Sequence, residues 1–235
     1  MTQRVVITGF GMVSPLANSA EETWQKIKAG QSGVGPITLF DTSNYAVKIA
    51  AEVKNFDAAA YMPAKEVRRR DRYQQFAVAA AMQAIEHAKF KLETDEQRER
   101  AGVFIGSAVG GVTHYFEQSI MLHETGDPRR VTPFGVPMLM PNGASGMVSI
   151  EIGAMGPSYT PTSACATGAD CIGTAFDYIR RGRLDYALAG AGEAPIIPIG
   201  VAAFDRIGAC SRRNETPHES IRPFAGDRDG LVFGE

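Results

Sequence analysis

Short apolar runs alternate along the chain with longer segments in which apolar residues recur at helical spacing. The runs at 4–9 (RVVITG), 102–106 (GVFIG) and 185–193 (DYALAGAGE) are bounded by glycine or charged residues. Continuous apolar runs of this length are typical of strands buried on both faces. A further strand is predicted over 157–164 (PSYTPTSA), directly before a cysteine.

Helices are predicted between these strands from capping residues and apolar spacing. The first begins at Asn18 or Ser19 and ends at Gly30, a longer one covers 71–89, and another lies within 142–154. The last predicted helix has apolar residues three or four positions apart: Ile172, Ala175, Phe176 and Ile179. This alternation predicts a layered α/β protein, with helices covering a sheet of largely buried strands.

The segment DRDGLVFGE at 227–235 places an Asp-Gly turn signal before a short apolar run. We expect a strand to begin there and to stop where the sequence stops. The chain is therefore expected to be incomplete at its C-terminal end.

Composition and charge exclude several classes of partner. The 235 residues are 44% hydrophobic and 21% charged, with a formal net charge of -2, so no global charge favours nucleic acid. No apolar run approaches the roughly 20 residues of a membrane span. The first residues lack the features of a secretory signal. A soluble cytoplasmic protein is expected, with no membrane and no nucleic acid partner.

Cysteine and histidine spacing gives no sign of a metal or of a disulfide scaffold. The three cysteines form no CxxC pair, and the four histidines lack metal-ligand spacing. The glycines after the first apolar run match only part of a dinucleotide-binding fingerprint. Neither a metal site nor a nucleotide cofactor is predicted.

Cys165 lies in the segment TPTSACATGAD, at a predicted strand-to-helix junction. The unpaired N–H groups and dipole of a helix start favour a thiolate there and lower the pKa of a thiol. Small neighbours such as Ala164, Ala166 and Gly168 leave room for a substrate carbonyl and for an oxyanion hole made by the backbone N–H of the cysteine. Free cysteines also commonly pack as small apolar residues, and position alone leaves both readings open.

Six segments resemble those of one family, in the same order along the chain. TSACATGAD resembles the active-site segment of β-ketoacyl-[acyl carrier protein] synthases, particularly the type II enzymes of fatty acid elongation. The other similar segments are RVVITGFGMVSPLAN, IGSAVGG, RRVTPFGVPM, LAGAGEAPI and SIRPFAGDRDGLVFGE. Because the motifs are independent and span the chain, the sequence is identified as a member of this family.

The resemblance implies a thiolase-like layered fold, α-β-α-β-α when complete. Residues 1–235 would then be the N-terminal domain, with a mixed sheet and truncated at the C-terminal end. It also implies a decarboxylating Claisen condensation in which Cys165 is the nucleophile. The implied partners are acyl- and malonyl-loaded acyl carrier protein and a second copy in a homodimer. No cofactor is expected, because the phosphopantetheine arrives on the carrier protein.

The family also has two active-site histidines, one of them in a His-Gly-Thr-Gly-Thr motif, and neither motif occurs here. The resemblance places both in the second half of such enzymes. The chain alone is therefore predicted not to decarboxylate a malonyl thioester. Surface or polar-network roles are expected for the four histidines that are present: His87, His114, His123 and His218.

The resemblance assigns two further sets of residues. Basic residues in KEVRRRDR, at 65–72, would dock the acidic carrier protein, although such a run is commonly only a solvated helix face. The docking candidates are Lys65, Arg68, Arg69 and the more distant Arg206. Val109 and Gly135 would line the acyl pocket, with Gly135 at the far end of the pocket of the partner subunit. Gly135 stands where relatives usually carry a phenylalanine, so either the cavity is deeper or a neighbouring side chain refills it.

Other functions compete with fatty acid elongation. A ketosynthase of a polyketide pathway would share nearly every motif. A thiolase would use a second cysteine from its other half, and a non-catalytic chain-length factor would normally lack Cys165. An assembly partner without its own activity is also open, because the expected histidines are missing.

Overall fold

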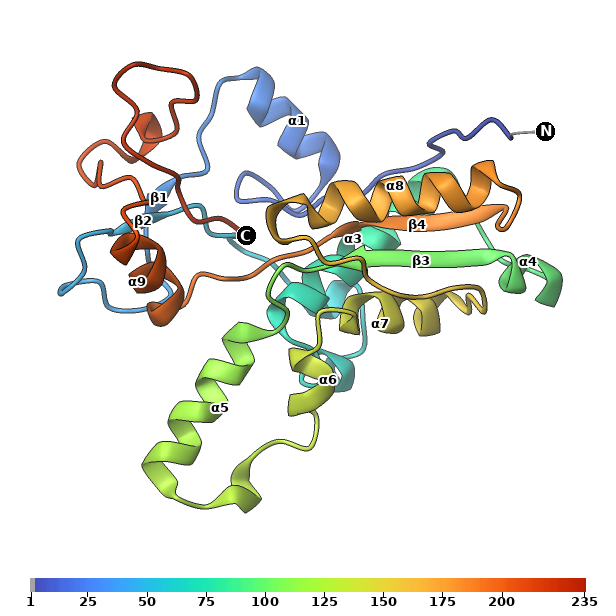
Figure 1. The fold of residues 1–235 in the computed structure, drawn as a ribbon, viewed down its shortest axis with the longest axis horizontal. Helices are drawn as coiled ribbons and strands as arrows, with labels where there is room; N and C mark the ends of the chain where they lie inside the picture. The colour runs from blue at the N-terminus through green and yellow to red at the C-terminus, as the bar shows by residue number, and fades with distance from the viewer. Residues whose placement is uncertain (1–2) are drawn as a thin grey trace. The chain divides into compact units, whose positions relative to one another are not determined.

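The computed structural model describes residues 3–235, which divide into two compact units. The larger unit contains the described residues up to Met12 together with Asp57–Glu193, and the smaller unit contains Val13–Phe56 and Ala194–Glu235 (Figure 1). Among the described residues, no helix is both long and apolar enough to cross a lipid bilayer.

A parallel pair of strands forms the centre of the larger unit. Strand β3 (Ala101–Gly106) pairs with β4 (Tyr186–Ala191) in register from one end to the other. Every residue of β3 is buried, as its continuous apolar sequence predicts. Figure 1 shows α8 (Thr167–Arg180) on one side of this pair and α7 (Gly143–Ile152) on the other. The predicted strands at 102–106 and 185–193 are confirmed.

Helix α3 (Arg72–Ala88) lies against α7 and agrees with the helix predicted over 71–89. Asp71 caps its first turn by accepting the Tyr73 N–H, and Gln74 accepts the Asp71 N–H in return. The helix ends at a left-handed Lys89. The larger unit also contains three short elements: η1 (Ala58–Ala60), α2 (Ala64–Val67) and α4 (Asp95–Glu99).

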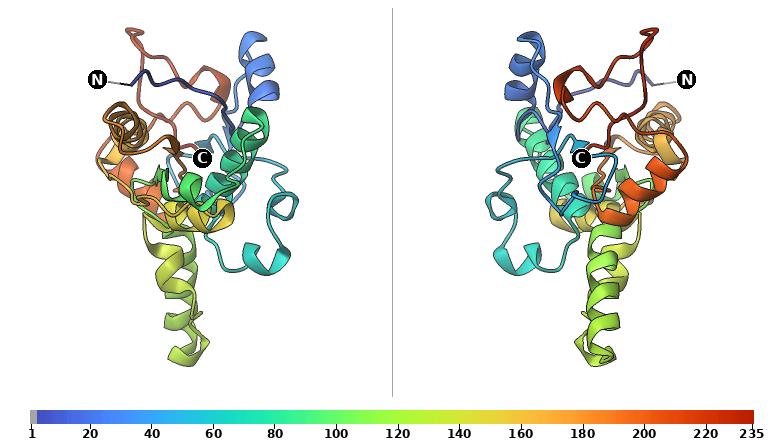
Figure 2. Two further views of the ribbon diagram at one scale, coloured as in Figure 1. Left: turned by 90° about the vertical axis from the view of Figure 1, so that its right-hand side faces the viewer. Right: turned by 90° about the vertical axis from the view of Figure 1, so that its left-hand side faces the viewer.

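Two helices that the sequence pattern did not predict form an arm on the larger unit. Helix α5 (Val112–Thr125) extends away from the strand pair, and α6 (Gly135–Leu139) returns beside it (Figure 2). A short 3₁₀ helix, η2 (Pro128–Arg130), lies between them. No residue of α5 is buried. The helix therefore lacks a fully buried apolar face, which is the signal that predicts a helix from sequence.

The smaller unit has its own core. Helix α1 (Ala20–Lys28) begins after the predicted cap Ser19, and β1 (Gly35–Pro36) pairs antiparallel with β2 (Ile49–Ala50). Helix α9 (Pro198–Arg206) and the 3₁₀ helix η4 (Pro217–Glu219) follow later in the chain. One cluster of buried residues includes a member of β2, a member of α9 and residues of the connecting segments: Ile37, Val47, Ala50, Ile196, Val201, Cys210 and Phe233.

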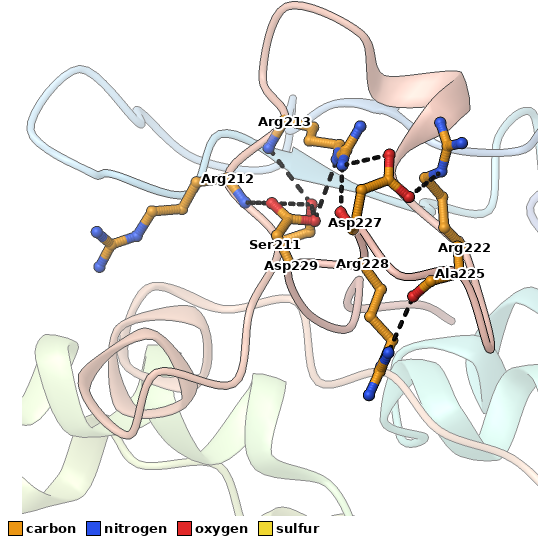
Figure 3. A network of polar contacts seen from close by, with 8 residues as sticks. All are labelled: Ser211, Arg212, Arg213, Arg222, Ala225, Asp227, Arg228 and Asp229. Carbon is orange, nitrogen blue, oxygen red and sulfur yellow. Dashed lines mark hydrogen bonds and ion pairs between the residues drawn. The ribbon is translucent and has the colours of Figure 1, made fainter.

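A network of ion pairs holds the last turns of the smaller unit (Figure 3). Arg213 contacts both Asp227 and Asp229, and Arg222 lies 3.3 Å from Asp227. Burial acts to raise the pKa of Asp229, but hydrogen bonds from Ser211, the Arg212 N–H and Arg213 outweigh it, so this pKa is lowered. These contacts favour the ionised form of the Asp229 carboxylate.

The strand predicted over 4–9 is wrong. Strands β3 and β4 hydrogen-bond directly to each other, and the side chains of Val6 and Ile7 remain 63% and 87% exposed. An apolar run forms a buried strand only where neighbouring strands pair with its backbone groups. Five residues of this segment instead line a cavity of about 330 Å³ beside β4: Arg4, Val5, Val6, Thr8 and Gly9.

Two further predicted strands are reduced to isolated bridges. In the segment 157–164, only Ser158 forms a bridge, to Val103, because Pro157 and Pro161 have no N–H to donate. In 227–235, single bridges form at Leu231 and Gly234. The described strands thus make one parallel and one antiparallel pair in separate sheets, in place of a single mixed sheet.

Candidate functional site

Cys165 lies at the turn that leads into α8. It is the middle residue of the 3₁₀ helix η3 (Ala164–Ala166), and α8 begins two residues later. Ala164 has a φ of 53°, in the left-handed region that residues with a Cβ rarely adopt. Backbone strain of this kind persists only where the surroundings enforce it, and it is concentrated at functional sites.

Contacts behind the turn enforce this conformation. The buried Thr167 accepts the Ser163 N–H through its hydroxyl oxygen at 2.9 Å. The end of β3 approaches so closely that a Cβ at Gly106 would lie 2.4 Å from Thr167 Cγ2 and 3.0 Å from Cys171 Sγ. A glycine at the end of β3 therefore leaves the space that the start of α8 occupies.

The three cysteines differ in their environment. Cys165 is exposed, whereas Cys171 and Cys210 are buried. Burial raises the pKa of the Cys171 thiol to about 11 and also raises that of Cys210. Both buried thiols are therefore held in the unreactive protonated form, which leaves Cys165 as the candidate nucleophile.

The loop after β3 is hydrogen-bonded to Glu193, which stands two residues after the end of β4. Ser107 donates a hydrogen bond to Glu193 Oε1, and the second carboxylate oxygen accepts the Ala108 N–H at 2.7 Å. The Ser107 hydroxyl in turn accepts the Gly110 N–H at 2.7 Å. These contacts fix the backbone on both sides of Val109, whose side chain is 47% exposed. Sequence reasoning did not identify the roles of Ser107 and Glu193.

The two acyl-pocket candidates lie on segments that touch each other. The Gly111 N–H, two residues after Val109, donates to the carbonyl oxygen of Leu139 at the end of α6, and α6 begins at Gly135. A Cβ at Gly135 would meet only Thr132 Cγ2, at an ordinary 3.6 Å, among the described atoms within 4 Å. A Cβ at this position therefore fits without a close contact.

A buried polar cluster, also missed by sequence reasoning, holds α6 beside α3. Gln74 donates to the carbonyl oxygen of Pro137 at 2.8 Å, and the Tyr73 hydroxyl donates to that of Met140. Asp71 accepts the His114 N–H at 2.9 Å and so caps α5 as well as α3. Burial raises the pKa of Asp71 and raises that of Tyr73 to about 12. The spacing of Asp71 and Gln74 is a capping-box signal that the sequence does contain.

The docking candidates fall into different environments. Lys65 and Arg68 are exposed, and no ion pair involving either is found in the described part of the chain. Arg69 pairs with Glu66 at 3.1 Å, and its guanidinium lies over the Phe134 ring at 4.7 Å. Arg206 is exposed at the end of α9 in the smaller unit.

The four histidines lie at the surface or contact a polar or aromatic side chain. The His87 ring lies 4.4 Å from that of Phe10, and His114 Nδ1 lies 3.7 Å from Glu117. His218 lies at 3.9 Å from Glu219, and His123 is exposed. Among the described residues, no group of three or more His, Cys, Asp or Glu side chains is arranged to hold a metal ion.

The sequence profile of the β-ketoacyl synthase N-terminal domain matches residues 2–235. The chain belongs to the β-ketoacyl synthase family. It is 41% identical over 233 residues to 3-oxoacyl-[acyl-carrier-protein] synthase 2 of Synechocystis sp., a match covering 99% of this chain and 56% of that protein. The chain thus spans just over half the length of the curated relatives it matches.

Solved structures of β-ketoacyl synthases agree with the fold. The crystal structure of a β-ketoacyl synthase from Burkholderia phymatum has a TM-score of 0.86 and 33% identity, covering 99% of this chain and 56% of that one. A type II polyketide ketosynthase in complex with its acyl-carrier protein has a TM-score of 0.79 and 27% identity, with the same coverage of both chains. The thiolase-like α/β fold class expected from the sequence is confirmed.

Proposed function

We propose that this chain contributes the nucleophile to a decarboxylating condensation of acyl and malonyl thioesters in fatty acid elongation. The observation that carries the proposal is the exposed Cys165 on a strained turn at the start of α8, in a chain of the β-ketoacyl synthase family. The names of the curated relatives support fatty acid elongation as the pathway.

Two covalent steps share Cys165. Its thiolate attacks the thioester carbonyl of an acyl carrier protein, so a carbon–sulfur bond to Cys165 forms and the bond to the phosphopantetheine sulfur breaks. The malonyl thioester then loses carbon dioxide, and the electron pair of the broken bond forms an enolate. The enolate carbon attacks the acyl-cysteine carbonyl, a carbon–carbon bond forms, and Cys165 leaves as a thiolate. The Cys165 N–H is the proposed donor to the oxyanion in each step.

Acyl carrier protein is the proposed partner. The exposed cations Lys65 and Arg68 are suited to an acidic surface, with Arg206 as a further docking candidate. The solved polyketide ketosynthase in complex with its acyl-carrier protein supports this type of partner. No cofactor of the chain's own is proposed, since phosphopantetheine would arrive on the carrier. A cytoplasmic homodimer is the proposed assembly.

Val109 and Gly135 are the proposed acyl-pocket residues. The space left by the missing side chain at Gly135, where a Cβ would make only an ordinary contact with Thr132, supports a pocket that accepts long or branched acyl chains. The same space, together with the 27% identical polyketide ketosynthase, supports a ketosynthase of a polyketide pathway as the second candidate function. Both candidates use the same Cys165 chemistry and differ in substrate.

The proposal is tested by assaying malonyl carrier protein decarboxylation and β-ketoacyl product formation. Two proteins are compared: this chain alone, and the complete synthase, in which the part of the relatives that this chain does not span is present. We expect condensation only in the complete synthase, because enolate-stabilising histidines are absent from this chain. Cys165→Ala in the complete synthase should abolish product. Turnover by the isolated chain, or product from Cys165→Ala, would contradict the proposal.

A further inference from the structure

We propose that Arg69 is a positioning residue for the acyl pocket and that it does not act as a free docking cation. Its guanidinium lies over the ring of Phe134, the residue directly before Gly135, with the guanidinium carbon 4.7 Å from the ring centroid. This inference rests on the proposed function, because it assigns Gly135 to the acyl pocket.

The charge of Arg69 is already balanced within its own turn. Its Nη1 lies 3.1 Å from Glu66 Oε1, and about two-thirds of each side chain is shielded from solvent. Lys65 and Arg68, which precede Arg69 in the same segment, are exposed. A cation held by a carboxylate and an aromatic face offers an approaching acidic protein less than an unpaired neighbour does.

The contact acts at the start of α6. The far end of α6 is fixed by Gln74 and Tyr73 through the backbone of Pro137, Met138 and Met140. At its start, the Phe134 and Gly135 N–H groups donate to Thr132, and the Thr132 N–H donates to Gln118. The contact with Arg69 adds a link from this start to another segment. Arg69 thus links the candidate docking turn to the segment that carries Gly135.

The contact is tested first by a double-mutant cycle in thermal unfolding of the 235-residue chain. Arg69→Gln, Phe134→Leu and the double variant are compared with the unsubstituted chain. We expect the double variant to lower the melting temperature by less than the sum of the two single effects, because both changes remove one shared contact. Arg181→Gln is the matched control, since it removes an ion pair within one helix, to Asp177 at 3.0 Å. Its effect should add to that of Phe134→Leu, and additivity for Arg69 as well would overturn the proposal.

The functional role is tested in the complete synthase by acyl chain-length profiles. Arg69→Gln and Phe134→Leu should shift the ratio of kcat/KM for long and short acyl chains in the same direction. The expected shift is about two- to fivefold, which corresponds to the energy of an exposed cation–π contact. Arg69→Lys should restore part of the ratio, because it keeps the charge and loses the planar guanidinium. Arg68→Gln should instead raise KM for the carrier-borne substrate and leave the ratio alone.

The outcomes separate the two claims. If Arg69→Gln raises the carrier KM as Arg68→Gln does and leaves the chain-length ratio unchanged, the positioning role is overturned. If the unsubstituted complete synthase forms no β-ketoacyl product, the proposed function fails instead. The double-mutant cycle would then still decide whether Arg69 positions Phe134.

Discussion

At the scale of single residues, the environment of each cysteine determines its chemistry more than its residue type does. Cys165 is exposed on a turn whose preceding residue has a left-handed backbone, whereas Cys171 and Cys210 are buried among apolar neighbours. Desolvation disfavours the thiolate at both buried positions. Burial and backbone geometry therefore favour Cys165 as the proposed nucleophile.

Gly135 is the residue at which acyl chain length is most directly testable. Gly135→Phe in the complete synthase should place an aromatic ring beside Thr132 and lower kcat/KM for long acyl chains relative to short ones by about tenfold or more. The measurement is the chain-length profile of condensation. Gly135→Ala is the matched control, because its Cβ fits at 3.6 Å and should change the profile little. Identical profiles for glycine and phenylalanine would exclude a specificity role.

At the scale of elements, the junction between β3 and α8 supports the nucleophile turn. Gly106 is the last residue of β3, and the space where its Cβ would stand is occupied by Thr167, Cys171 and Thr160. Because Thr167 also holds the Ser163 N–H, displacement of α8 would be transmitted to the turn that carries Cys165.

Gly106→Ala should therefore destabilise the chain by about 1–3 kcal/mol, the usual cost of overpacking a filled site. Gly173→Ala is the matched control on α8, where a Cβ meets no described atom within 4 Å. Replacing a helical glycine there should stabilise the chain by up to about 1 kcal/mol. Chemical denaturation of both variants checks the prediction. Equal effects of the two substitutions would show that β3 and α8 do not pack as described.

Helices were predictable where the sequence carries a local signal. Ser19 and Asp71 cap the helices that follow them, and apolar spacing marks α3 and α8. Strands were less predictable because pairing depends on distant segments. The apolar run at 4–9 has strand composition, but none of the described strands pairs with it, and the prolines in 157–164 interrupt a ladder.

The candidate site was likewise predictable only where its signal is local in the sequence. Cys165 could be singled out locally, from a junction surrounded by small residues. The contacts of Ser107 with Glu193 and of Arg69 with Phe134 join positions far apart in the sequence, so only the fold brings them together. The atoms that a side chain at Gly135 would contact likewise depend on the fold, and composition does not specify them.

At the scale of the whole molecule, the chain folds into two compact units and spans 56% of the length of its Synechocystis relative. The nucleophile turn, the Val109 loop and the start of α6 all belong to the larger unit. The larger unit therefore contains the residues proposed for acyl transfer to Cys165, whereas decarboxylation is assigned to groups that this chain does not contain.

The measurement that tests this account most directly is intact-mass labelling, followed by peptide mapping. The chain and the complete synthase are each treated with an acyl thioester and with a cysteine-directed inhibitor of condensing enzymes. A single adduct at Cys165 is expected, because this is the exposed thiol while Cys171 and Cys210 are buried. Indiscriminate labelling of all three cysteines in both proteins would contradict the account. Cys165 would then be interpreted as a cysteine that packs as a small apolar residue.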